Sequence, residues 1–269
     1  HSVTQNCDKY GLRRNSMKVL VINGSPKLEK SNSLRLTNAF IKGLQSETEA
    51  EIERLDIYRL NIEPCQGCLS CWKRTPGKCF KNDDMAGCIE KLIAADVIIW
   101  SFPLYYYSLP GRMKNFIDRQ VPTMKPVMKD RYDGKGNGKH SSRYDLSHQR
   151  HVYISTCGFF SDKGNYDAVR AQMDLIHGVG NYTTLFCGEG EMFPVPILKD
   201  RIAEYLSYVS QAGVDYVRYG TILPATREKL DELIMPKAEF EKMGDSYYAH
   251  CEAKAAKLAK EKAEAAEAK

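Results

Sequence analysis

The sequence contains no apolar run long enough to cross a membrane as a helix. Its longest apolar stretches, such as 97–100, fall far short of the roughly 20 residues that such a helix needs. The basic residues near the start are not followed by the apolar segment of a secretory signal. We therefore expect a cytoplasmic protein with no membrane partner.

Several signatures of common active sites are also missing. The chain has neither a Gly-Lys-Ser/Thr phosphate loop nor a GxGxxG turn, which disfavours sites for a nucleoside triphosphate or a Rossmann-type dinucleotide. No Ser/His/Asp constellation or pair of carboxylates stands out, so hydrolysis is not supported. The net charge of +5 is modest and accompanies no recognition motif, so we expect no nucleic-acid partner.

Cysteine, in contrast, is abundant. Nine cysteines are many for a chain without a secretory signal, and an odd number cannot all pair. A disulfide framework is therefore disfavoured, and metal binding or redox chemistry is favoured.

Short apolar runs alternate with helix-periodic segments, which favours an α/β fold whose parallel sheet is covered by helices on both faces. The pattern predicts strands at 17–23, 51–58, 96–101, 152–156 and 182–187. It predicts helices at 33–44, 84–95, 111–119, 166–179 and 201–219, the second capped by Asp84. Beyond Pro224 the alternation stops. There the sequence predicts a short helix at 236–248 and a tail, 252–269, that is helical by propensity with almost no apolar stripe.

This order divides the chain into three parts. Residues 1–16 are expected to be a disordered or added extension, because Met17 directly precedes the first strand. Residues 17–222 form the main domain, with an aperiodic cysteine loop at 61–82 and a long basic insertion at 120–149. Residues 223–269 form a helical C-terminal extension with a charged tail.

The loop after the first strand, residues 23–33, has the composition of a phosphate site. A glycine allows a sharp turn and a close approach, and the following helix start offers unpaired N–H groups. Its polar side chains are Ser25, Ser31, Asn32 and Ser33. A helix cap, in which these side chains only satisfy backbone donors, is the alternative explanation.

Pro103 and three consecutive tyrosines, 105–107, follow the third strand. Three such tyrosines cannot all enter one core, so at least one should face the sheet edge. Flat apolar walls of this kind suit an isoalloxazine ring. A glycine-bearing turn, 155–159, follows the next strand, and the carboxyl ends of parallel strands form one ligand-binding edge.

The Gly-Ser-Pro and Ser-Asn-Ser opening and the segment 102–118, Phe-Pro-Leu-Tyr…Pro-Gly-x-x-Lys-Asn-Phe-Ile-Asp, together resemble the NADPH-dependent FMN reductase group of flavodoxin-like proteins. The resemblance covers about residues 17–220. It implies a flavodoxin-like three-layer fold with a five-stranded parallel sheet of order 2-1-3-4-5, FMN at the strand ends, and a homodimer or homotetramer.

The resemblance also implies roles for the residues at matching positions. The FMN phosphate would be held by Ser25, Lys27, Ser31, Asn32 and Ser33. The flavin ring would be lined by Pro103, Leu104, Tyr105 and Tyr106, with Thr156, Cys157 and Gly158 at its other edge. Ser33 stands where relatives often have Thr, which keeps the hydroxyl.

The run Cys65-x2-Cys68-x2-Cys71-x7-Cys79 is the second chemically informative feature. Three cysteines spaced by two residues can wrap one face of an iron–sulfur cube, with a fourth arriving from a short loop. The segment resembles the loop of the iron–sulfur flavoproteins, which implies a 4Fe–4S cluster on these four residues, although the seven-residue gap lies at the long end of that pattern. Three alternatives stay open, namely free thiols, a zinc site, and a redox pair of the first two cysteines.

Other candidates carry less weight. Cys88 falls at an apolar position of a predicted helix and is expected in the core. His148 and His151 could share a metal if they lay on one helix, but their polar neighbours favour a solvated loop.

We therefore expect an FMN-dependent NAD(P)H oxidoreductase that passes electrons to a quinone, flavin or protein acceptor, with a 4Fe–4S cluster as relay if the cysteines bind one. The alternative is a non-enzymatic, flavodoxin-type electron carrier. Hydride transfer to FMN requires no side-chain acid or base, so no catalytic residue is assigned.

Overall fold

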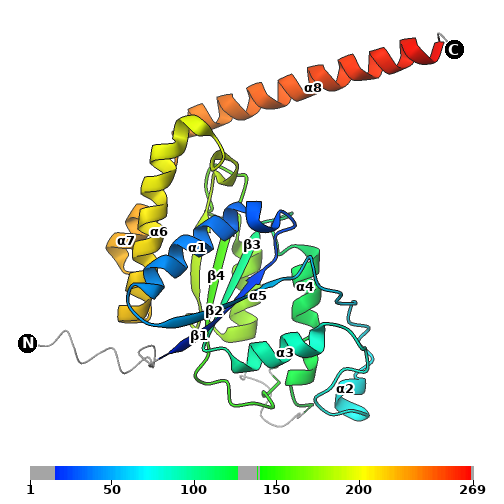
Figure 1. The fold of residues 1–269 in the computed structure, drawn as a ribbon, viewed down its shortest axis with the longest axis vertical. Coiled ribbons are helices and arrows are strands. Elements are labelled where there is room, and N and C mark those ends of the chain that lie inside the picture. The colour runs from blue at the N-terminus through cyan, green and yellow to red at the C-terminus, as the bar shows by residue number, and fades with distance from the viewer. Residues whose placement is uncertain (1–15, 127–137, 139, 268–269) are drawn as a thin grey trace, which may run out of the picture. The chain divides into compact units, whose positions relative to one another are not determined.

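The computed structural model describes residues 16–126, 138 and 140–267 (Figure 1). Five parallel strands form one sheet in the order β2-β1-β3-β4-β5, which confirms the predicted topology. The strands are β1 (Met17–Asn23), β2 (Ala50–Asp56), β3 (Val97–Pro103), β4 (Arg150–Thr156) and β5 (Thr183–Cys187). Connections leave β1 and β3 in opposite directions, so the carboxyl ends of these two neighbouring strands form a topological switch point.

The helices follow the predicted alternation. They are α1 (Asn32–Gln45), α2 (Ser70–Lys73), α3 (Met85–Ala94), α4 (Gly111–Asp118), α5 (Asp167–His177), α6 (Lys199–Tyr219), α7 (Pro224–Leu230) and α8 (Lys237–Glu267). The prediction of a purely aperiodic cysteine loop is wrong at α2, and the pattern also misses α7. One or two helical turns are too short to show a period of 3.6 residues.

Two details of the prediction are corrected at the helix ends. The side chain of Asp84 does not cap α3. Its carboxylate accepts from the Asn61 N–H at 2.7 Å, and the neighbouring Asp83 accepts from the Met85 N–H at 3.2 Å. The short helix and the tail expected at the C-terminus form the single continuous helix α8.

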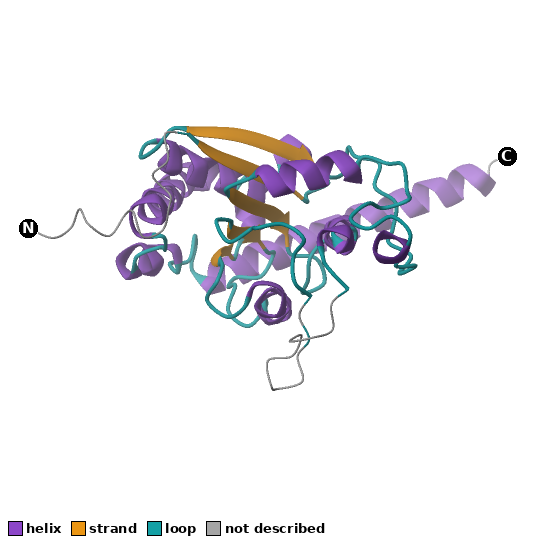
Figure 2. Ribbon diagram, turned by 90° about the horizontal axis from the view of Figure 1, so that it is seen from below, coloured by secondary structure: helices purple, strands orange, loops and turns teal. Residues whose placement is uncertain are grey.

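Helices cover both faces of the sheet (Figure 2). One face packs against α1 and α6, which contact each other through a Phe40–Tyr216 ring pair at 5.6 Å. The other face packs against α3, α4 and α5. Because both faces are covered, the central strands are almost continuously apolar rather than alternating, as in β1.

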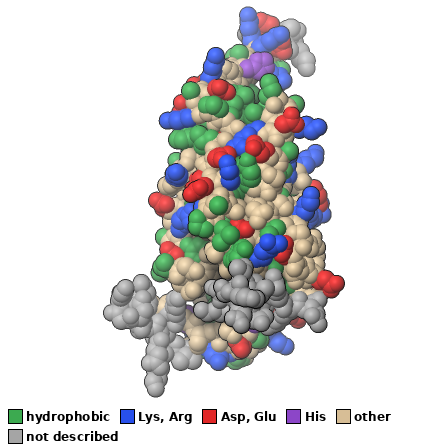
Figure 3. Space-filling view, turned by 90° about the vertical axis from the view of Figure 1, so that its left-hand side faces the viewer, with side chains coloured by type: hydrophobic (Ala, Val, Ile, Leu, Met, Phe, Trp, Pro, Cys, Tyr) green, Lys and Arg blue, Asp and Glu red, His purple; other side chains and the backbone are tan. Residues whose placement is uncertain are grey.

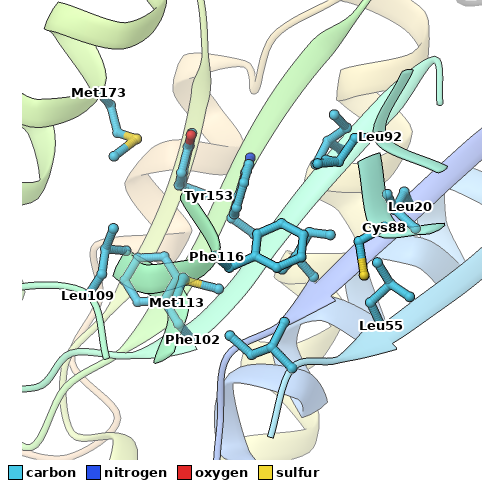
Figure 4. Packing of buried hydrophobic residues seen from close by; sticks show 14 of the residues in the cluster. Leu20, Leu55, Cys88, Leu92, Phe102, Leu109, Met113, Phe116, Tyr153 and Met173 are labelled. Carbon is cyan, nitrogen blue, oxygen red and sulfur yellow. The ribbon is translucent and has the colours of Figure 1, made fainter. Parts of the chain in front are cut away.

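Figure 4 shows how the second face is filled. Side chains from β3 and β4, including Phe102 and Tyr153, meet Met113 and Phe116 from α4. Cys88 of α3 lies in this cluster and is 3% exposed, which confirms its predicted place in the core. A large core on this face holds the carboxyl ends of the strands in fixed positions.

Two glycines allow α1 and α6 to pack closely. A Cβ added at Gly43 would lie 1.8 Å from the Ser210 carbonyl oxygen, and one at Gly213 would lie 2.0 Å from the Phe40 carbonyl oxygen. No side chain fits at either position. This contact fixes α1, whose first turn faces the switch point.

The chain divides into two compact units, residues 1–232 and 233–269. Within the second unit, α8 exposes nearly all of its described side chains. Lys–Glu pairs four residues apart, such as Lys237 with Glu241 and Lys257 with Glu261, support it as a solvated helix.

The predicted extension, 1–16, lies outside the described residues except for Ser16, and so do 127–137 and 139 of the basic insertion. The described ends of that insertion carry a short 3₁₀ turn, Val121–Thr123, and an antiparallel bridge between Met124 and Ser142. None of the described helices is both long and apolar enough to span a membrane. On the face seen in Figure 3, positive and negative side chains are interspersed.

Candidate functional site

The loop that joins β1 to α1, residues 23–33, is shaped by its own polar groups. The Asn23 amide donates to Asp56 Oδ1 at 2.8 Å, and its oxygen accepts from the Ser25 N–H at 3.2 Å. The Ser25 hydroxyl in turn accepts from the Lys27 N–H at 3.2 Å. These contacts fix the loop at the carboxyl end of β1.

The first turn of α1 presents serine hydroxyls at the same edge. Ser31 Oγ accepts from the Leu34 N–H at 3.3 Å and so caps the helix. Ser33 Oγ lies 2.8 Å from Thr156 Oγ1, which links the helix start to the end of β4. A hydroxyl that accepts one hydrogen bond keeps a proton to donate, so the helix cap and a bound phosphate are compatible explanations of this loop.

The other residues matched to the phosphate role differ in exposure. Ser25 is buried, Lys27 is exposed, and Asn32 is partly buried. The Asn32 amide donates to the Gly190 carbonyl at 2.7 Å, which ties the loop to the turn after β5. Gly190 approaches closely here, because an added Cβ would lie 2.8 Å from Thr156 Cβ. The sequence shows the turn-forming residues of 188–194 but not this contact.

The tyrosine segment forms a two-residue hairpin turn. Tyr105 and Ser108 exchange both backbone hydrogen bonds at 3.0 Å. Between them, Tyr106 has φ 47° and Tyr107 has φ 63°, the left-handed conformation that such turns usually assign to Asn-Gly. Tyr106 is 97% exposed, while Tyr107 stacks on Phe159 with centroids 5.5 Å apart.

The two residues of this turn with strained backbone, Tyr106 and Tyr107, also expose their aromatic rings to solvent. Each non-glycine residue held at positive φ costs on the order of 1 kcal/mol, and such strain clusters at binding sites. The prediction that at least one tyrosine faces the sheet edge is confirmed by their exposure. Phe159, which the sequence did not single out, extends the aromatic surface.

The end of β4 adjoins the turn. The Leu104 N–H donates to the Thr156 carbonyl at 2.9 Å. The Cys157 thiol is buried and lies 3.8 Å from the Ser161 carbonyl oxygen, and burial raises its pKa. Cys157 therefore serves the core as a small side chain, while the exposed Gly158 and the backbone remain at the edge.

The cysteine loop encloses a second candidate site. One small cavity of about 50 Å³ lies inside it. All four cysteines of the run line this cavity, namely Cys65, Cys68, Cys71 and Cys79. Left-handed backbone at Gly67 (φ 63°) and Leu69 (φ 55°) winds the loop around the cavity. The spacing of the run therefore brings its four sulfur-bearing residues together.

The thiols influence one another. Burial raises the pKa of Cys71, and the neighbouring Cys79, Cys65 and Cys68 raise it further. Hydrogen bonds from Ser70 lower the pKa of Cys68. Among the described residues, no three His, Cys, Asp or Glu side chains converge as they would around a single ion. Four cysteines around one cavity are the donor set that a polynuclear cluster uses, since such a cluster gives each cysteine its own iron.

A buried ion pair supports the same cavity. Arg119, at the end of α4, donates to both oxygens of Asp83 at 2.6 and 2.9 Å, and to the Glu63 carbonyl at 2.6 Å. Both side chains of the pair are about 1% exposed. Nothing in the local sequence marks Arg119, because a basic residue after a helix is an ordinary finding.

The remaining sequence candidates do not form a metal site. His148 precedes β4 in a loop and His151 lies within the strand, so they do not share a helix face. His151 instead packs against His177, with ring centroids 4.0 Å apart. Trp72 of the cysteine loop donates to the Val121 carbonyl at 3.2 Å, which links this loop to the 3₁₀ turn that follows α4.

A family model described as a flavodoxin-like fold matches residues 17–193. An iron-sulfur flavoprotein of Archaeoglobus fulgidus is 33% identical over 119 residues, 44% of this chain and 52% of the relative. An FMN-dependent NADH:quinone oxidoreductase of Exiguobacterium is 30% identical over 111 residues, covering 38% and 53% of the two chains. The chain thus spans about half the length of the curated relatives it matches.

Solved structures show the same fold. An NAD(P)H:quinone oxidoreductase from Methanothermobacter marburgensis aligns with a TM-score of 0.56 at 23% identity, over 74% of this chain and 98% of that one. An FMN-dependent NADH-azoreductase from Bacillus anthracis in complex with FMN aligns with a TM-score of 0.52 at 14% identity, over 75% and 99%. At these identities the likeness concerns the fold alone.

Proposed function

Because this chain belongs to the flavodoxin-like fold family, we propose that it is an FMN-dependent NAD(P)H oxidoreductase that passes electrons to a quinone, flavin or protein acceptor. One observation carries this proposal. Buried serine hydroxyls and a strained, exposed tyrosine turn meet at the carboxyl ends of β1, β3 and β4. Relatives with about 30% identity are named FMN-dependent NADH:quinone oxidoreductases, which supports the proposed reaction.

The polar part of the site fits the FMN phosphate. Buried hydroxyls and the α1 N-terminus supply hydrogen-bond donors without water competing for them, and the exposed Lys27 adds a positive charge. In this proposal the phosphate ligands are Ser25, Lys27, Ser31, Asn32 and Ser33.

The apolar part fits the flavin ring. Exposed aromatic faces beside backbone N–H and C=O groups match a flat ring with polar edges. In this proposal the ring contacts Pro103, Leu104, Tyr105 and Tyr106 on one side, and on the other it contacts Thr156, Gly158 and the backbone of Cys157. Bound FMN supplies the hydride and one-electron chemistry, while these residues orient the ring and exclude water from it.

The cysteine cavity is proposed to hold a 4Fe–4S cluster through Cys65, Cys68, Cys71 and Cys79. Four cysteine thiols around one cavity are the donor set that such clusters use. A bound cluster supplies one-electron transfer. Curated relatives named iron-sulfur flavoproteins support this assignment.

A homodimer or homotetramer is part of the proposal. Tyr106 is 97% exposed and lies beside the half-exposed Tyr107 and Phe159, which gives an aromatic surface that a second copy would cover. Sedimentation velocity of the FMN-loaded protein measures this directly, and a sedimentation coefficient of a monomer would remove the oligomer from the proposal.

Anaerobic stopped-flow mixing with NADH or NADPH tests the proposed activity. We expect the oxidised flavin absorbance of FMN-loaded protein to disappear after mixing with one nicotinamide and to return when a quinone is added. If neither nicotinamide reduces a flavin that dithionite does reduce, the chain is the alternative electron carrier rather than a reductase.

A further inference from the structure

The buried ion pair between Arg119 and Asp83 borders the cysteine cavity. The Arg119 side chain lines that cavity together with the four cysteines. Its Nη1 and Nη2 donate to the Asp83 carboxylate at 2.6 and 2.9 Å, and Nη1 also donates to the Glu63 carbonyl. Both side chains of the pair are about 1% exposed, and removing two charges from water is costly. A buried pair at this cavity therefore suggests a role at the cavity itself.

One N–H donor of this guanidinium makes no hydrogen bond. Within the described part of the chain, Arg119 Nε is buried without a hydrogen-bond partner. Cys79 lines the same cavity as Arg119, so its thiol is a polar group on the cavity side of the guanidinium.

A buried N–H that lacks a partner is rare, because it loses its water without replacement. Cysteine thiolates that bind iron carry negative charge and accept hydrogen bonds from N–H groups. The reduction potential of an iron–sulfur cluster depends on its net charge environment and on hydrogen bonds to its sulfurs.

We propose that Arg119 is a positioning residue for the cluster, which orients the Cys79 ligand through an Nε–H···S hydrogen bond and raises the reduction potential of the cluster through its charge. This inference rests on the cluster of the proposed function. The electron comes from FMN reduced by NAD(P)H, and it adds one negative charge to the cluster without a proton. The nearby guanidinium stabilises that added charge, and the Asp83 carboxylate opposes it.

Because Arg119 and Asp83 carry opposite charges, neutralising one or the other should shift the reduction potential of the cluster in opposite directions. Arg119→Gln removes the positive charge, Asp83→Asn removes the negative charge at nearly unchanged shape, and Arg119→Lys keeps the charge but loses the Nε–H. Arg112→Gln on the same helix is the matched control, because Arg112 is solvent-exposed and donates to the Tyr58 carbonyl. Each variant is purified anaerobically and assayed for iron and acid-labile sulfide per chain. The cluster midpoint potential is then measured by mediated titration followed by electron paramagnetic resonance.

At a fixed potential we expect Arg119→Gln to lower the ratio of reduced to oxidised cluster about tenfold, which is about 59 mV for a one-electron couple. Asp83→Asn should raise the ratio, and Arg119→Lys should lower it by less than Arg119→Gln. The Arg112→Gln control should leave the ratio within about twofold. If Arg119→Gln does not hold iron, Arg119→Lys and Asp83→Asn still provide shifts of opposite sign.

Two results separate the possible failures. Wild-type protein without stoichiometric iron and sulfide would refute the proposed cluster itself, and this inference with it. A loaded wild type whose Arg119 and Asp83 variants keep the wild-type potential, or shift it in the same direction, would leave the cluster standing and overturn the role of Arg119.

Discussion

Ser31 Oγ caps α1 by accepting from the Leu34 N–H, and Ser33 Oγ shares a hydrogen bond with Thr156 Oγ1, so both hydroxyls serve the fold at the place proposed for the phosphate. At the scale of the residue, this double use explains why the loop composition alone could not separate a helix cap from a phosphate site. The two functions need the same side chains in the same place.

The double variant Ser31→Ala/Ser33→Ala is expected to weaken FMN binding about 100-fold, because two hydrogen bonds to a charged group contribute roughly 1.5 kcal/mol each. Fluorescence titration of the apoprotein measures this. Ser46→Ala, at the other end of α1, is the control, since its hydroxyl only donates to the Gly43 carbonyl. Equal FMN affinity in the double variant and the control would rule out the assigned phosphate ligands.

His151 gives a prediction about pH. Burial, then the charges of His177 and Arg150, lower its pKa from 6.5 to about 3. The unfolded chain therefore binds a proton below about pH 6.5 that the folded chain excludes until about pH 3, so stability falls as the pH drops through this window. Between pH 7 and 5 we expect a loss of roughly 1–2 kcal/mol from this residue, allowing for partial solvent screening.

Urea unfolding at both pH values measures this loss. In His151→Gln the difference between pH 7 and pH 5 should shrink by about that amount, because glutamine does not titrate and can still accept from Trp100, which lies 3.4 Å from the histidine. His250→Gln, at an exposed position of α8, should leave the difference as in the wild type. A pH dependence that is unchanged in His151→Gln would show that this histidine is not the acid-sensitive group.

At the scale of the element, the tyrosine turn has a strained backbone and presents an exposed aromatic surface. Tyr106→Asn/Tyr107→Gly supplies the residues that this turn type prefers, so we expect the free energy of unfolding to rise by about 1–2 kcal/mol. The same change removes the Tyr106 ring that is proposed to line the flavin, and it should weaken FMN binding at least about tenfold. A more stable variant with unaltered FMN affinity would place the flavin elsewhere.

The α1–α6 contact gives the second prediction at this scale. Gly43→Ala should destabilise the fold by about 3 kcal/mol, because its Cβ would overlap the Ser210 carbonyl at 1.8 Å. Gly87→Ala on α3, where nothing lies within 4 Å, should instead stabilise by about 0.5–1 kcal/mol through helix propensity. Thermal unfolding of both variants measures the difference, and similar melting temperatures would contradict the close packing of α1 on α6.

The elements that the sequence predicted are those with a repeated signal. Five apolar runs and the helices between them specified the sheet and its covering helices, because burial on both faces imposes that pattern. The short α2 carries too few residues for a period, and Asp84 resembles a cap although its carboxylate binds Asn61 instead.

At the scale of the molecule, the sequence predicts which residues reach the sheet edge but not what they contact there. Ser33, Thr156 and Gly190 come from distant parts of the chain, and only the fold brings them together. The same holds for Arg119 and Asp83, which meet across 36 residues. Contacts between elements depend on packing geometry, which no local pattern in the sequence records.

The central claim is that residues 23–33 hold the phosphate of FMN, and comparing FMN with riboflavin tests it most directly. Riboflavin has the same ring but no phosphate, so the difference in affinity isolates this loop. Titration of the apoprotein should show one FMN per chain and riboflavin binding at least about 100-fold weaker, as expected from two or more charge-assisted hydrogen bonds. Equal affinities, or no binding of FMN, would contradict the account.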